Sequence, residues 1–157
     1  MFFVLQNTLN GSRVAGIRLK NQNMESKLSR IVSLALIIAA VIHLLPLSGV
    51  FGPDHLSTLY GLNFEENNIE ILMRHRAILF GLLGIFLLYA ALNSRLHVYG
   101  MVAGTVSVLS FLLIAWSVGG YNAKVSRVFL ADVVALISLI IGAVFHLIKV
   151  KRSAEVE

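Results

Sequence analysis

Four long apolar segments constrain the fold of this chain more than any other feature. A helix needs about 20 apolar residues to cross the hydrocarbon core of a membrane, and each segment is long enough to do so. The segments cover residues 31–50, 69–92, 98–118 and 128–148. Only 13% of the residues are charged, against roughly 25% in an ordinary soluble domain. We therefore predict an all-α polytopic membrane protein, in which residues 31–148 form a single up-down bundle of four transmembrane helices.

The remaining segments are polar. Residues 1–30 are predicted to be a cytoplasmic tail without regular structure, or the product of an upstream start, because Met24 could also begin the chain. A basic start followed by Ala39-Ala40 could also form a cleaved signal peptide, but the apolar run continues past these alanines, which favours a retained helix. Residues 51–69 contain turn-forming glycine, proline and asparagine and are predicted to be an acidic loop, and residues 149–157 to be a second cytoplasmic tail.

Lysine and arginine are concentrated on one side of the predicted topology. The nine on that side are Arg13, Arg18, Lys20, Lys27, Arg30, Arg95, Lys149, Lys151 and Arg152. The other side has Lys124 and Arg127, besides two arginines inside the second segment. Because positive residues favour the cytoplasmic side, we expect a bacterial inner-membrane protein with both termini in the cytoplasm. These charges lie beside apolar segments, so we expect them to contact anionic lipid head groups and not nucleic acid.

Ionisable side chains within apolar segments are costly in a membrane and mark candidate functional positions. The topology brings His43, Arg74, Arg76 and Asp132 toward the outer surface, and we predict an ion pair of Asp132 with Arg76 or Arg74. Positions two apart on a helix point in different directions, so one arginine should face the bundle while the other reaches the head groups. Tyr60 could also contribute to the roof of this site. The candidate polar pocket comprises His43, Arg74, Arg76, Asp132, Tyr121, Asn122 and Arg127.

Each candidate also has a structural interpretation. An Arg–Asp pair can fix the register of two helices, and His43 can form hydrogen bonds within the bundle. His75 and His97 are expected at the membrane interfaces, and His146 beside the inner head groups. Small residues recur at helical spacing on all four segments, Gly100-x-x-x-Gly104 among them, and should let the helices approach closely.

Several kinds of chemistry are excluded or unsupported. The chain has no cysteine, which excludes disulfides and thiolate metal sites. It has no Walker loop, no His-Glu-x-x-His and no Gly-x-Ser-x-Gly. We expect no metal and no cofactor. The candidate pocket has more positive groups than the single negative group of Asp132, which predicts an anionic ligand such as a lipid phosphate or a carboxylate.

Six stretches carry a family resemblance: His43-Leu44-Leu45-Pro46, Leu59-Tyr60-Gly61, the run from Ile71 to Gly84, Ala115-Trp116, Gly119-Gly120-Tyr121-Asn122 and Leu130-Ala131-Asp132. Over about residues 27–148 the chain resembles uncharacterised small bacterial four-helix membrane proteins that are broadly DoxX-like. The resemblance implies the four-helix architecture. Some similar proteins carry the label phosphopantetheine adenylyltransferase. We interpret that label as a transfer error, because the chain lacks the Thr/His-x-Gly-His motif and the sheet pattern of that enzyme.

Three functions are compatible with these residues. The first is a non-enzymatic accessory or lipid- and anion-interacting bundle, whose partners would be membrane lipids, an anionic small molecule or lipid, or a second copy or another membrane protein. The second is a membrane enzyme or redox accessory, with His43 as the acid/base group, Arg76 as an anion clamp and Asp132 as its orienting partner. The third is a small transporter, for which polar groups at several depths would be needed.

Overall fold

A computed structural model describes the backbone of residues 2–154 and the side chains of residues 19–152. Its elements are α1 (Phe2–Leu44), the 3-10 helix η1 (Leu45–Phe51), α2 (Pro53–Tyr60), α3 (Asn67–Leu92), the 3-10 helix η2 (Ser94–Leu96), α4 (His97–Val118) and α5 (Ala123–Ala154). The described part of the chain is helical apart from short turns, and it contains no strand. The predicted all-α fold class is therefore confirmed.

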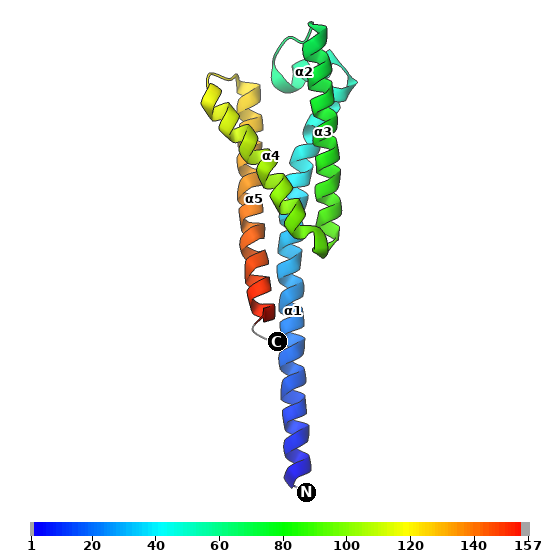
Figure 1. Cartoon of the computed structure of the whole chain (residues 1–157), viewed down its shortest axis with the longest axis vertical. Coiled ribbons are helices and arrows are strands. Elements are labelled where there is room, and N and C mark those ends of the chain that lie inside the picture. The colour runs from blue at the N-terminus through cyan, green and yellow to red at the C-terminus, as the bar shows by residue number, and fades with distance from the viewer. Residues whose placement is uncertain (1, 155–157) are drawn as a thin grey trace.

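The long helices run up and down beside one another (Figure 1). Helix α1 packs along both α5 and α3, and α4 contacts α5 and α3. Within the described residues, four helical stretches are long and apolar enough to span a membrane, namely Leu19–Phe51, Asn67–Leu92, Ser94–Val118 and Ala123–Arg152. Both termini lie toward the same end of the bundle, and α2 lies at the opposite end, which we call the α2 end (Figure 1).

Two predictions about the segments outside the spans are wrong. Residues 1–30 were expected to have no regular structure, yet α1 is helical from Phe2. No proline precedes Pro46 to interrupt the helix. Part of the extension is also packed by α5, because Leu28 is buried and Arg152 donates a hydrogen bond to Met24 Sδ at 2.7 Å.

The acidic loop predicted over residues 51–69 contains the helix α2. Pro53 and Asp54 occupy its first turn, as is typical of a helix start. Gly61 ends it in the left-handed conformation (φ 66°), with its N–H bonded to the carbonyl of Ser57. The proline and glycine that indicated a loop are therefore the start and stop signals of a short helix.

Small residues create the closest helix contacts, as predicted. A Cβ placed on Gly100 would lie 2.7 Å from Ala90 Cβ, and one on Gly142 would lie 3.0 Å from Ala35 Cβ. These contacts surround a central core whose members are fully or almost fully buried: Val32, Leu36, Ala39, Ala40, Leu87, Ala90, Ala91, Met101, Val108, Ala135 and Leu139. The outward faces carry exposed Leu, Ile and Val side chains, which suits contact with lipid.

Candidate functional site

A cavity of about 240 Å³ lies at the α2 end of the bundle. Its walls come from α1, η1, α2, α3 and α5, so segments from both halves of the sequence are needed to form it. The lining residues are Ile42, His43, Leu45, Pro46, Thr58, Leu59, Tyr60, Arg76, Phe80, Lys124, Arg127, Val128, Ala131 and Asp132. Most of this surface is apolar, and the charged groups are three cations and one carboxylate.

The Arg76 guanidinium is held by aromatic rings from three different helices. Its Cζ lies 5.5 Å from the ring centroid of Tyr60, 4.9 Å from that of Phe80 and 5.9 Å from that of Phe111. A guanidinium within about 6 Å of a ring is attracted to the negative face of that ring. Phe80 follows Arg76 by four residues and so lies on the same face of α3. The rings therefore fix the position of the charge at the cavity wall.

Asp132 faces the same cavity from α5 and is only 8% exposed. No hydrogen bond to its carboxylate, and no ion pair within 4.0 Å, is found among the described residues. It does interact electrostatically with Arg76 at longer range. The predicted ion pair of Asp132 with Arg76 or Arg74 is therefore absent among the described residues. Arg76 stacks on the three rings, and Arg74 pairs with Glu70.

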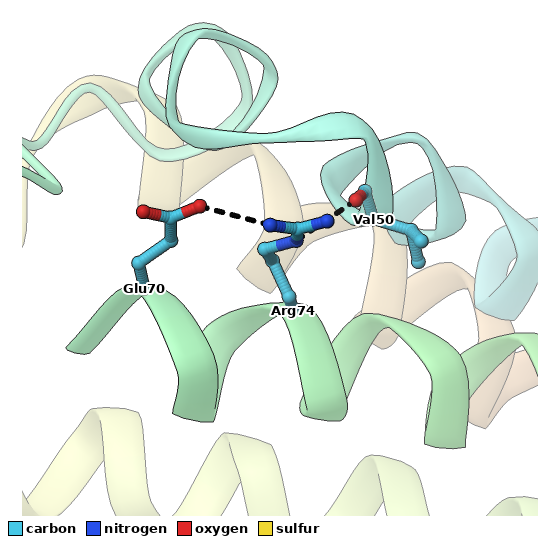
Figure 2. A network of polar contacts seen from close by, with 3 residues as sticks. All are labelled: Val50, Glu70 and Arg74. Carbon is cyan, nitrogen blue, oxygen red and sulfur yellow. Dashed lines mark hydrogen bonds and ion pairs between the residues drawn. The ribbon is translucent and has the colours of Figure 1, made fainter. Parts of the chain in front are cut away.

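Arg74 lies outside the cavity lining. Its Nη1 contacts Glu70 Oε1 at 3.0 Å, and its Nε donates a hydrogen bond to the Val50 carbonyl at 3.0 Å (Figure 2). The expectation that Arg74 and Arg76 point in different directions is confirmed. Arg74 joins the first turns of α3 to η1, and Arg76 belongs to the cavity.

His43 is buried, and both of its ring nitrogens form hydrogen bonds. It is 2% exposed, with Nδ1 at 2.8 Å from the Ala39 carbonyl and Nε2 at 3.0 Å from Ser107 Oγ. A carbonyl can only accept, so Nδ1 carries the proton, and Nε2 of the neutral ring accepts from the Ser107 hydroxyl. This confirms the structural interpretation of His43 as a group hydrogen-bonded within the bundle, here linking α1 to α4.

Asn122, another predicted pocket residue, has a structural role. Its Oδ1 accepts from the N–H groups of Lys124 and Val125, both at 2.9 Å, which caps the start of α5. Its Nδ2 donates to the Tyr60 carbonyl at 2.8 Å and to the Gly61 carbonyl at 3.3 Å. Asn122 therefore ties the end of α2 to α5.

Tyr121 stacks on Phe129, with ring centroids 5.8 Å apart, and does not line the cavity. The structure thus brings together four of the seven predicted pocket residues, His43, Arg76, Asp132 and Arg127, at one cavity.

Tyr60 and Lys124 are further polar members of the lining. Burial raises the pKa of Tyr60 above its ordinary value of 10.0; the positive charge of Arg76 opposes this effect, and the negative charge of Asp132 adds to it. Tyr60 was expected at this site from its position, whereas Lys124 was counted only for topology. The signal that could have identified Lys124 is its place in the first turn of α5, two turns before Asp132.

The histidines near the other end of the bundle also differ from expectation. His97, expected at an interface, is 1% exposed, and its Nε2 lies 3.4 Å from Ser33 Oγ. His97 is the first residue of α4, and its side chain lies beside Ser33 of α1. His146 Nδ1 is buried without a hydrogen-bond partner among the described residues. His75, in the first half of α3, is exposed, which is compatible with its expected place at an interface.

Within the described residues, no group of three or more His, Asp or Glu side chains is arranged to hold a metal ion. Comparison with protein-family models, with curated proteins and with solved structures finds no match. The chemistry of the cavity is therefore the basis on which a function can be assigned.

Proposed function

We propose that this chain is a non-catalytic integral membrane protein that binds an amphiphile with a phosphate or carboxylate group in the cavity at its α2 end. The supporting observation is the charge of the lining, where Arg76, Lys124 and Arg127 stand against the single carboxylate of Asp132. Guanidinium groups bind phosphate and carboxylate oxygens with paired, charge-assisted hydrogen bonds. An anion in the cavity would therefore be stabilised.

The walls of the cavity favour an amphiphile over a small hydrophilic anion. Leu45, Pro46, Phe80 and Val128 line it together with the charged groups. Ligand sites of this kind use apolar surface for affinity and a few polar groups for orientation. An acyl chain can lie along the apolar wall while its anionic group contacts the arginines. The ligand is therefore expected to be a membrane component.

A membrane enzyme or redox accessory is the second candidate, because His43, Arg76 and Asp132 do line one cavity. Acid/base catalysis would require a free ring nitrogen on His43, and both are engaged by Ala39 and Ser107. A transporter is less well supported. Among the described residues, the core cluster between His43 and His97 consists of apolar side chains, and the buried Ser138 hydroxyl is already bonded to the Ala135 carbonyl.

We also propose an inner-membrane location with both termini in the cytoplasm, which would place the α2 end outside. The excess of Lys and Arg near the termini supports this orientation. The resemblance to DoxX-like proteins remains part of the proposal and rests on the sequence stretches described above.

Two arginines of one helix provide the experiment. The full chain would be extracted gently from its own membrane as the wild type, Arg76→Gln and Arg74→Gln, and retained molecules would be identified by native mass spectrometry. Arg74→Gln is the matched control, since it removes the same charge from α3 without touching the cavity lining.

We expect the wild type and Arg74→Gln to retain an amphiphile with an anionic group, and Arg76→Gln to lose it while remaining folded. Equal retention by both variants, or no retained amphiphile in the wild type, would refute the proposed function. In that case Arg76 would serve only to join α2, α3 and α4 through the rings of Tyr60, Phe80 and Phe111.

A further inference from the structure

Asp132 is poorly suited to a ligand that carries only negative charge. An ionised carboxylate can accept hydrogen bonds but cannot donate them, so an anion beside it would be repelled. Its near-complete burial, without a hydrogen bond or an ion pair within 4.0 Å among the described residues, makes the charge costly. A ligand that fits this cavity should therefore present a donor to Asp132 as well as an anion to the arginines.

Arg76 cannot serve as that donor without leaving its present position. Three rings hold its guanidinium at the α3 wall, while Asp132 lies on α5. The two side chains line one cavity and interact electrostatically, but they are not in direct contact. A positive and a negative subsite are thus held apart on facing helices.

We propose that the ligand is a phospholipid whose head group carries a primary ammonium next to the phosphate, as in phosphatidylethanolamine. This inference rests on the proposed function and names its substrate class. The phosphate would contact Arg76 and Arg127, and the ammonium would donate hydrogen bonds to Asp132. The short ethanolamine link joins a negative and a positive group in one head group, which matches two neighbouring subsites of opposite sign.

The relative retention of three lipids shows whether the site selects by the donor of the head group or by net charge alone. Three cations against one carboxylate would favour phosphatidylglycerol, which is negative, over phosphatidylethanolamine, which has no net charge. Phosphatidylcholine keeps the positive charge of its head group but has no N–H to donate. Phosphatidylglycerol has hydroxyl donors but no positive charge, so of the three lipids only phosphatidylethanolamine offers the Asp132 carboxylate both a positive charge and N–H donors. We therefore expect phosphatidylethanolamine to be retained on the order of tenfold better than either of the other two lipids.

The test uses the full chain in nanodiscs that contain equal amounts of phosphatidylethanolamine, phosphatidylglycerol and phosphatidylcholine, with retained lipid measured by native mass spectrometry. Asp132→Asn keeps the shape of the side chain and removes its charge. Asp54→Asn is the control, since Asp54 is exposed in the first turn of α2 and lies outside the cavity lining. We expect Asp132→Asn to abolish the tenfold preference while phosphatidylglycerol retention stays at least as high, and Asp54→Asn to behave as the wild type.

A second series needs no variant and remains informative if Asp132→Asn does not fold. Wild-type protein would be offered phosphatidylethanolamine and its mono-, di- and trimethylated forms, which lose N–H donors stepwise at constant charge. Retention should fall with each methyl group. Soluble glycerophosphoethanolamine carries the same head group without acyl chains, and it should not compete at equal concentration.

The outcomes distinguish the two proposals. If the wild type retains phosphatidylglycerol as well as phosphatidylethanolamine, or if methylation has no effect, the selectivity inference is overturned; the proposed function survives if Arg76→Gln still loses both lipids. Equal competition by glycerophosphoethanolamine would overturn the lipid assignment. If Arg76→Gln retains every lipid as the wild type does, the proposed function itself fails.

Discussion

Gly84 of α3 packs directly against the last turn of α1. A Cβ added there would lie 2.7 Å from Leu44 Cγ, 2.8 Å from Leu44 Cδ2 and 3.1 Å from the carbonyl oxygen of Ala40. Leu44 is the last residue of α1, and the next two residues, Leu45 and Pro46, line the cavity. Gly84→Ala should therefore push apart the two helices that support one wall of the site.

The magnitude follows from two opposing effects. Alanine is favoured over glycine in a helix interior by about 1 kcal/mol. Inserting a methyl group into a packed contact costs about 1–3 kcal/mol, and the Ala40 carbonyl belongs to a backbone that cannot move by changing a rotamer. The expected net result for Gly84→Ala is a loss of stability of up to about 2 kcal/mol.

Gly104→Ala provides the matched control. Its Cβ would meet the side-chain ends of Leu139 at 3.2 Å and Leu87 at 3.4 Å, and both can shift slightly. This variant should be neutral or more stable by up to about 1 kcal/mol. Both free energies of unfolding would be measured by reversible unfolding in mixed detergent micelles. If Gly84→Ala were as stable as Gly104→Ala, the close contact of α1 and α3 described here would be refuted.

Three further predictions concern the ends and the core of the bundle. The Glu66 carboxylate accepts from the N–H groups of Asn68 and Ile69, which lowers its pKa below the ordinary 4.5. Its contribution is therefore present above pH 4.5 and is lost as the pH falls through the lowered value. The protection factors of the amides in the first turn of α3, which correct for the intrinsic pH dependence of exchange, should therefore fall in acid in the wild type and change little with pH in Glu66→Gln. A double-mutant cycle of His43→Gln and Ser107→Ala should give a coupling energy of about 0.6 kcal/mol and no more than about 1.7 kcal/mol, measured from the same unfolding transitions. Gly61→Ala should destabilise the protein by about 1–2 kcal/mol because Gly61 has a φ of 66°, and an unchanged unfolding midpoint would contradict this.

The sequence is sufficient to predict the four spans because a membrane requires long uninterrupted apolar helices. Residues 69–92 and 98–118 were located to within two residues of α3 and α4. The same reasoning placed His43, Arg76 and Asp132 near one end of the bundle, where the structure has them around one cavity. Depth in a membrane is a one-dimensional quantity, and residue position along a span determines it.

Side-chain partners could not be predicted in the same way, because they depend on rotation about the helix axis and on competing neighbours. Arg74 has an acid one turn away, Glu70, and this local ion pair competes with Asp132 for its guanidinium. Arg76 had aromatic rings on α2 and α4 within reach, and these belong to elements far from it in the sequence. His97 is buried because Ser33 of α1 lies beside it, which periodicity within α4 does not reveal.

The separation of Arg76 from Asp132 has an energetic consequence that can be measured. An unpaired aspartate in the middle of a membrane helix costs about 2.5–3.5 kcal/mol on insertion scales, and less near an interface. A direct ion pair with Arg76 would offset this cost within the chain, but the rings of Tyr60, Phe80 and Phe111 hold the guanidinium away from the carboxylate. A ligand that satisfies both groups should then stabilise the fold, by about 2.7 kcal/mol at one hundred times its dissociation constant. Because part of this stabilisation would come from the donor that reaches Asp132, lipid that matches both subsites should raise the thermal midpoint of the wild type clearly and that of Asp132→Asn much less. An equal rise in the two proteins would mean that the carboxylate takes no part in binding.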